Sequence, residues 1–176
     1  MVGAFLRAID AISYAAAAAA AACLGAMTLL MLAEVVARNV FAQSLTFSWE
    51  FSGYLMGAVF FFGAAYTFRT GGHVRVSILS ETLSAPAARG LEYATTLVGL
   101  AITGFLFHAI LDLLLSSYSR GIKSFTPMET PLILPQGVLA LGALLLLLQM
   151  VARLIRLLRG EAPDIPADEA VLGSDQ

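Results

Sequence analysis

The chain has 176 residues, of which 59% are hydrophobic and only 12% are charged, and its mean hydropathy is +0.85. A water-soluble domain of this length needs a polar surface that this composition excludes, so the sequence predicts an integral membrane protein. The net charge of −2 leaves no basic surface large enough for nucleic acid, and the single cysteine, Cys23, excludes an internal disulfide and a cysteine-clustered metal site.

Four apolar runs predict four membrane-spanning helices, at about 12–36, 49–68, 91–115 and 132–152. Each run is long enough to cross the hydrocarbon core of a bilayer, which takes about 20 residues. The first run follows Arg7 and contains eight consecutive alanines. A basic residue followed by an apolar run with many small residues is also typical of a secretory signal peptide. We expect an uncleaved helix instead, because the apolar part of a signal spans only about 7–15 residues. The expected fold is an all-α integral membrane domain over residues 1–159.

A short surface helix is expected between the second and third spans. Gly71 and Gly72 release the helical backbone after the second span. Apolar residues at 76, 79 and 83 then recur at helical spacing until Pro86. This pattern predicts a helix that lies on the cytoplasmic membrane surface.

The distribution of basic residues predicts the orientation. Four spans place both termini on one side, and seven arginines fall on that side against three basic residues on the other. Both termini are therefore expected in the cytoplasm, and residues 160–176 are expected to form a disordered acidic tail there. The arginines that end the fourth span are expected to snorkel toward phosphate headgroups, and they are Arg153, Arg156 and Arg159.

Few ionisable residues lie within the predicted spans, and each is a candidate for function. Glu34 and Arg38 lie four residues apart, so they can form an ion pair that anchors the outer end of the first helix. His108 and Asp112 share one face of the third helix. They are candidates for a proton relay or for a hydrogen-bonded pair that docks another helix, and we favour the second. Gln149 is expected to make a hydrogen bond between helices.

Enzymatic and redox functions find no support among the residues. A membrane b-type haem needs two histidines at matching depth, whereas His73 and His108 are predicted near opposite faces. We expect no cofactor, and the sequence contains no recognisable hydrolase triad, metal cluster or phosphate loop. The predicted midplane segments consist of Ala, Leu, Phe and Gly, which suits a scaffold better than a substrate path.

Four short motifs occur in a fixed order around the second span. They are Arg38-Asn39-Val40-Phe41, Phe47-Ser48-Trp49-Glu50, Gly63-Ala64-Ala65-Tyr66 and the hinge Arg69-Thr70-Gly71-Gly72-His73-Val74-Arg75-Val76. In this order and spacing, the chain resembles the small, DctQ-like membrane subunit of tripartite ATP-independent periplasmic (TRAP) transporters. It departs from that pattern at Trp49, where a glutamate is common, at Gly53, where an arginine is common, and at Ser77, where an aspartate is common.

The resemblance implies a non-catalytic subunit in a bacterial inner membrane. Such a subunit joins a large multi-span permease subunit, which contains the substrate and sodium sites, while a soluble periplasmic protein delivers an organic anion, typically a carboxylate. The small subunit is expected to brace the large one and to help dock the binding protein. A stand-alone or self-associating four-helix membrane protein that contacts lipids remains the alternative.

Several residues are expected to contact partners or to fix the topology. Gly53 and Gly57 place two small residues on one helix face, where another helix can approach. The basic residues of the hinge are expected to set the depth of the second span by snorkelling and by contacts with helix ends. The full set is Arg38, Trp49, Glu50, Gly53, Gly57, Arg69, His73, Arg75, His108 and Asp112.

Overall fold

The computed structural model describes residues 2–70 and 85–161, and within these ranges the chain forms four long helices. They are α1 (Val2–Phe41), α2 (Ser48–Arg69), α4 (Ala85–Arg120) and α5 (Ile133–Leu158). All four are long and apolar enough to span a membrane. In the described ranges no strand forms, although an isolated bridge pairs Lys123 with Pro131. The prediction of an all-helical chain with four membrane-length helices is confirmed.

Each helix covers its predicted span to within one residue, and three of them extend well beyond it. The largest difference is in α1, whose 40 residues make a helix about 60 Å long, roughly twice the thickness of the hydrocarbon core. Hydropathy marks only the apolar part of a helix, whereas backbone hydrogen bonding continues through the polar residues at its ends. The predicted surface helix falls largely in 71–84 and the predicted tail largely in 162–176, outside the described residues.

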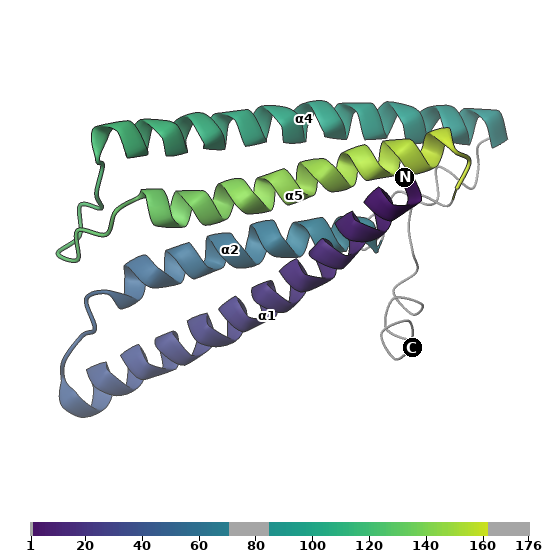
Figure 1. The fold of residues 1–176 in the computed structure, drawn as a ribbon. Coiled ribbons are helices and arrows are strands. Elements are labelled where there is room, and N and C mark those ends of the chain that lie inside the picture. The colour runs from purple at the N-terminus through teal and green to yellow at the C-terminus, as the bar shows by residue number, and fades with distance from the viewer. Residues whose placement is uncertain (1, 71–84, 162–176) are drawn as a thin grey trace.

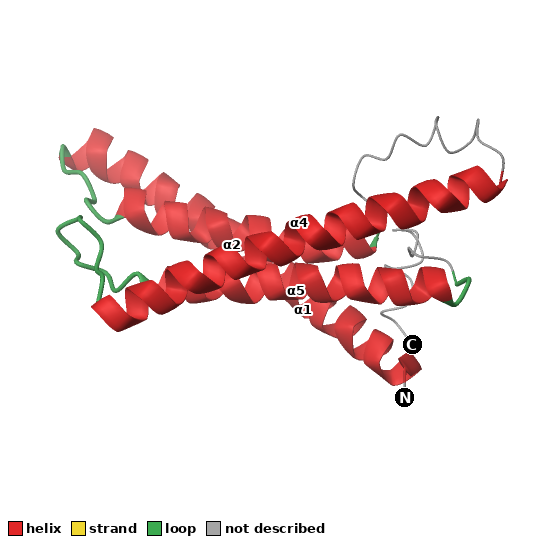
Figure 2. Ribbon diagram, turned by 90° about the horizontal axis from the view of Figure 1, so that it is seen from above, coloured by secondary structure: helices red, strands yellow, loops and turns green. Residues whose placement is uncertain are grey.

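The helices lie in a single layer in the order α4, α5, α2, α1 (Figure 1). α5 packs between α4 and α2, α2 packs between α5 and α1, and α1 also reaches α5. Among the described helices, α4 contacts α5 alone. α4 and α1 lie at the two edges of the layer, and seen from above their axes cross (Figure 2). The arrangement leaves an open edge at α4 and another at α1.

Small residues set the spacing of the layer. Ala16 of α1 and Ala65 of α2 are buried together with Leu145 of α5. A Cβ on Gly142 of α5 would lie 2.6 Å from the Cβ of Phe61 of α2, so only glycine fits at that point. The helices therefore approach closely where alanine and glycine face one another, as is common in membrane proteins.

The two predicted glycines of α2 differ in their surroundings. A Cβ on Gly57 would lie 2.8 Å from Cδ2 of Leu139, so Gly57 lies at the contact with α5. Nothing lies within 4 Å of a Cβ on Gly53. Of this pair, only Gly57 supports a helix contact within the described residues.

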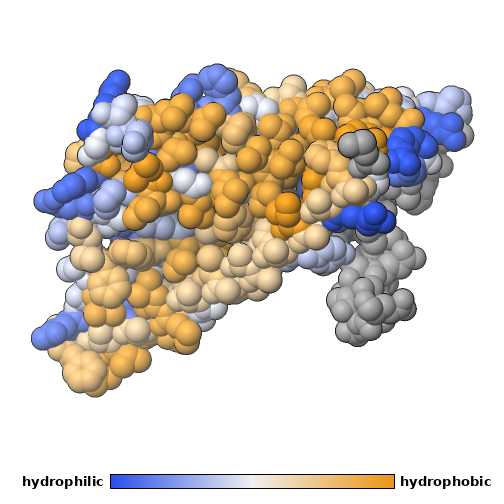
Figure 3. Space-filling view, in the orientation of Figure 1, coloured by the Kyte–Doolittle hydropathy of each residue, from blue (hydrophilic) through white to orange (hydrophobic). Residues whose placement is uncertain are grey.

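The surface of the layer is largely apolar. In Figure 3 hydrophobic residues cover most of the middle of the visible face, and hydrophilic residues gather toward the two ends. Large side chains such as Leu29, Phe60 and Phe105 are well exposed on three different helices. Contiguous apolar surface of this extent needs lipid or another protein against it.

The close approach at Gly142 yields a testable prediction. Gly142→Ala should lower the free energy of unfolding by about 1–3 kcal/mol, because the new Cβ meets the Cβ and the backbone carbon of Phe61. Gly137→Ala is the matched control in the same helix, since nothing lies within 4 Å of its Cβ. The two variants are to be compared by thermal unfolding in detergent. Equal stability of both variants would contradict the contact.

Candidate functional site

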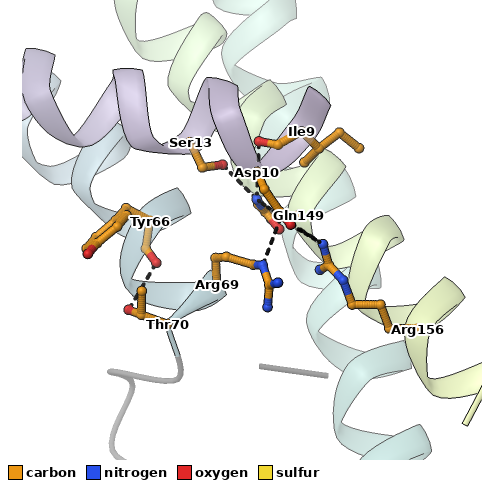
Figure 4. A network of polar contacts seen from close by, with 8 residues as sticks. All are labelled: Ile9, Asp10, Ser13, Tyr66, Arg69, Thr70, Gln149 and Arg156. Carbon is orange, nitrogen blue, oxygen red and sulfur yellow. Dashed lines mark hydrogen bonds and ion pairs between the residues drawn. The ribbon is translucent and has the colours of Figure 1, made fainter. Parts of the chain in front are cut away.

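A half-buried carboxylate, that of Asp10, joins three helices near one end of the layer (Figure 4). Asp10 of α1 accepts a hydrogen bond from Nε of Arg69, the last residue of α2, with an N–O distance of 2.8 Å. Nη2 of Arg156, in the last turn of α5, donates to both oxygens of Asp10 at 2.7 and 2.9 Å. The side chains of Arg69 and Arg156 are only 6% and 5% exposed. Asp10 thus holds two buried guanidinium groups.

Gln149 extends this arrangement along α5. Its Nε2 donates to Oγ of Ser13 at 2.7 Å and to the carbonyl oxygen of Ile9 at 3.4 Å, so it provides the helix-to-helix hydrogen bond that the sequence suggested. Gln149 and Ser13 are both almost fully buried. We call Asp10, Ser13, Arg69, Gln149 and Arg156 the Asp10 cluster, and the end of the layer that contains it the cluster end.

The burial of Arg69 and Arg156 corrects the prediction that their side chains snorkel toward headgroups. Arg69 and Arg156 turn toward Asp10 instead of toward headgroups, because the carboxylate lies within hydrogen-bonding distance of both. Arg159 alone among the arginines that end α5 is exposed, where it pairs with Glu161 at 2.9 Å. Arg69 and Arg156 also lie at the C-terminal ends of their helices, where the helix dipole favours positive charge.

Arg153 and Tyr93 bring α4 into the same end. Nε of the buried Arg153 donates to Oγ1 of Thr96 in α4 at 3.1 Å. Its guanidinium carbon lies 5.5 Å from the ring centroid of Phe68 in α2, which is within cation–π range. The hydroxyl of Tyr93 in α4 donates to the carbonyl of Leu157 at 2.9 Å. All four helices are therefore joined by polar contacts at the cluster end.

Two short loops lie at the opposite end, which we call the hairpin end. Glu34 forms the expected ion pair with Arg38, with a distance of 2.5 Å between Oε1 and Nη2. Glu34 also accepts a hydrogen bond from Oγ of Ser44 at 2.7 Å and one from the backbone amide of Leu45 at 2.6 Å. The residue therefore holds the α1–α2 turn, in which Ala42 has a positive φ of 52°.

Glu50 links α2 to the loop between α4 and α5. Its carboxylate accepts hydrogen bonds from the hydroxyl of Tyr54 at 2.6 Å and from Oγ1 of Thr126 in that loop. The loop is itself held by the backbone hydrogen bond from Ser124 to Thr130, at 2.8 Å. Glu50 therefore joins the two hairpins of the chain at the hairpin end.

Exposed aromatic residues surround this link. Trp49 is 79% exposed and Phe125 is fully exposed, although the residues next to them are held by the Glu50 and Thr126 contacts. In the same loop Lys123 pairs with Glu129 at 2.9 Å, and this hydrogen bond lowers the pKa of Glu129 below its ordinary value. The hairpin end thus presents apolar side chains on an ordered loop.

The remaining predicted site residues fall into two groups. His108 and Asp112 form a close polar pair, with 2.9 Å between Nδ1 and Oδ2, but their side chains are 75% and 65% exposed. No helix within the described ranges packs on them, so the partner helix stays a prediction. His73 and Arg75 lie outside the described residues.

The Asp10 cluster includes residues that the sequence analysis missed. The predicted first span begins at residue 12 and therefore does not include Asp10. One signal in the sequence indicates such a role. Asp10 is the single acid just before the first span, and it lies on the side of the membrane that has most of the arginines. Within the described ranges, no group of three or more His, Cys, Asp or Glu side chains is arranged to hold a metal ion.

Comparison with known families gives one match. The family model described as tripartite ATP-independent periplasmic transporters, DctQ component, matches residues 27–160. The matched segment begins within α1 and ends just after α5, and it covers well over half of the chain. Neither curated proteins nor solved structures give a match.

The Asp10 cluster predicts a strong effect of a nearly isosteric change. Asp10→Asn removes the charge that balances Arg69 and Arg156, so the free energy of unfolding should fall by about 3–5 kcal/mol. The measurement is denaturant or thermal unfolding of the purified chain in micelles.

Glu161→Gln is the matched control, because it removes the acid of the exposed Arg159–Glu161 pair at the same end and should change stability little. Adding Arg156→Gln to Asp10→Asn should be less damaging than the sum of the two single changes, because it removes one of the unbalanced charges. Equal stability of Asp10→Asn and Glu161→Gln would show that the cluster does not hold the helices together.

Proposed function

Because the chain belongs to the DctQ component family of the tripartite ATP-independent periplasmic transporters, we propose that it braces the large permease subunit of such a transporter. The family is one of transporter components and not an enzyme family, and it implies that this chain is a small permease subunit. The bracing role, the partners in contact and the transported solute are our proposal.

The observation that carries the proposal is the single layer of helices with polar joints at its ends. The Asp10 cluster joins α1, α2 and α5 at one end, and the Glu50–Thr126 hydrogen bond joins the two hairpins at the other. Between these ends the layer presents apolar surface. Such a layer suits a rigid support that lies beside a moving membrane protein. The substrate and sodium sites in the large subunit, and an organic anion, typically a carboxylate, as the solute, belong to the proposal because the family resemblance implies them.

The orientation is also a proposal. Arg7, Arg69, Arg89, Arg153, Arg156 and Arg159 belong to the cluster end, whereas the hairpin end has Arg38, Arg120 and Lys123. The positive-inside rule then puts the cluster end and both termini in the cytoplasm of a bacterial inner membrane. The hairpin end accordingly faces the periplasm, where a substrate-binding protein can reach it.

The proposed function is tested by expressing the chain with its genomic neighbours. We expect a large multi-span membrane protein to co-purify with it, and we expect uptake of the solute to stop when this chain is deleted. Purification of the chain alone, together with unchanged uptake after its deletion, would refute the proposal. A detergent-corrected mass that equals several copies of this chain without any partner would support the self-associating alternative.

The exposed aromatic residues of the hairpin end predict an effect on docking. Phe125→Ala should raise the Kd of the periplasmic binding protein for the assembled membrane complex about tenfold, or about 1.4 kcal/mol, because apolar contact area is lost. The assembly of the complex itself should not change. Surface plasmon resonance on complexes in nanodiscs measures this Kd. Phe60→Ala is the control, because Phe60 is exposed within the apolar span of α2, away from the hairpin end. An unchanged Kd for Phe125→Ala would exclude this loop from docking.

A further inference from the structure

A close pair of polar side chains, His108 and Asp112, lies exposed on the free edge of the layer. Nδ1 of His108 and Oδ2 of Asp112 are 2.9 Å apart on α4, the helix at the edge of the layer in Figure 1. Their side chains are 75% and 65% exposed, and among the described helices α4 packs on α5 alone. Within the described residues, each of these two side chains has the other as its polar partner and no further one.

The depth of this pair follows from the pairing of α4 with α5. Thr96 of α4 lies beside Arg153, and Gly104 lies beside Leu147, so the two helices run antiparallel in register. Each residue further along α4 faces about one residue earlier in α5. By this count His108 is level with residues 141–143.

These residues occupy the middle of the membrane-spanning part of α5. The uncharged stretch of α5 runs from Ile133 to Ala152 and is about 30 Å long, which equals the thickness of the hydrocarbon core. His108 therefore lies near the bilayer midplane, deeper than the sequence analysis predicted, and Asp112 lies one helical turn toward the hairpin end. A charged side chain that faces lipid at that depth is unfavourable by about 2.5–3.5 kcal/mol on the insertion scale. This energy favours a protein contact over lipid at His108 and Asp112.

The pair belongs to a continuous row of exposed residues on α4. Their spacing alternates between four and three residues, which is the pattern of a seam between two helices that cross at a small angle. Two of them are alanines, which permit close approach of another backbone. The row, which we call the α4 seam, contains Ala94, Val98, Ala101, Phe105, His108 and Asp112, all exposed.

We propose that the α4 seam packs against a membrane-spanning helix of the large permease subunit, and that a hydrogen-bond donor on that helix binds the Asp112 carboxylate. The inference rests on the proposed function and adds to it the contact face and the chemistry of the partner. The donor is a hydroxyl, amide or cationic side chain near the midplane. A second copy of this chain fits poorly, because a two-fold contact brings both Asp112 carboxylates to the same depth, where like charges repel strongly.

A paired substitution separates docking from folding. His108→Leu combined with Asp112→Leu should leave the stability of the isolated chain unchanged or higher, because it removes polar groups from a lipid-facing surface. The same variant should reduce the amount of large subunit that co-purifies about tenfold, because the partner's donor loses its acceptor. Unchanged recovery of the large subunit would overturn the proposal.

Photo-cross-linking tests the seam with His108 and Asp112 intact. A photoreactive amino acid at Phe105 should give an adduct with the large subunit in membranes that contain the full transporter. The matched position is Leu24 of α1, an exposed apolar residue on the opposite edge of the layer, where we expect no such adduct. Adducts from Phe105 only with lipid, adducts with a second copy of this chain, or equal yields from both positions would each overturn the inference.

The two proposals fail in different ways. When the large subunit co-purifies but Phe105 does not cross-link to it, the contact face is wrong and the bracing function stands. When the chain is expressed with its genomic neighbours and no large subunit co-purifies, the proposed function itself is wrong.

Discussion

The arrangement of the helices depends on the carboxylate of Asp10. Taking a guanidinium group out of water is unfavourable by several kcal/mol unless an anion accompanies it, and this anion accompanies two of them. α1, α2 and α5 must therefore meet where Asp10, Arg69 and Arg156 can touch. Apolar packing could slide one helix past another in lipid with little change in buried area. The shared carboxylate fixes the register of three helices at one end.

The rest of the layer follows from that fixed end. Glycine and alanine let α5 approach α2 closely, and Gly142 marks the tightest contact between them. Among the described residues α4 joins the layer through α5 alone, so the position of α4 is set by the α4–α5 hairpin and not by the Asp10 cluster directly. The outcome is an open layer with two free edges, which differs from a closed bundle in exposing a whole side of its outermost helices.

The sequence predicts the parts of this structure that depend on local patterns. Apolar runs of membrane length predict all four helices, and the four-residue spacing predicts both the Glu34–Arg38 and the His108–Asp112 pairs. Hydropathy does not predict where a helix ends outside the apolar zone, as α1 illustrates. The Asp10–Arg69 contact joins residues 59 apart, and the Asp10–Arg156 contact joins residues 146 apart. Nothing in local spacing indicates such contacts, because they depend on which helices become neighbours. For the same reason Gly53 and Gly57 look equivalent in sequence, yet of the two only Gly57 lies at a contact with another described helix.

The chain order of the Asp10 cluster has a consequence for biosynthesis. Asp10 and Arg69 both belong to the first hairpin, so that hairpin carries a neutral ion pair of its own before α5 has been synthesised. Arg156 arrives only with α5, after the other three described helices. If the cluster end is the side from which the ribosome feeds the membrane, none of these three charges crosses the hydrocarbon core during insertion. α1 and α2 can then remain in the bilayer as a pair in which Asp10 balances the charge of Arg69, and α5 later adds Arg156 to complete the cluster.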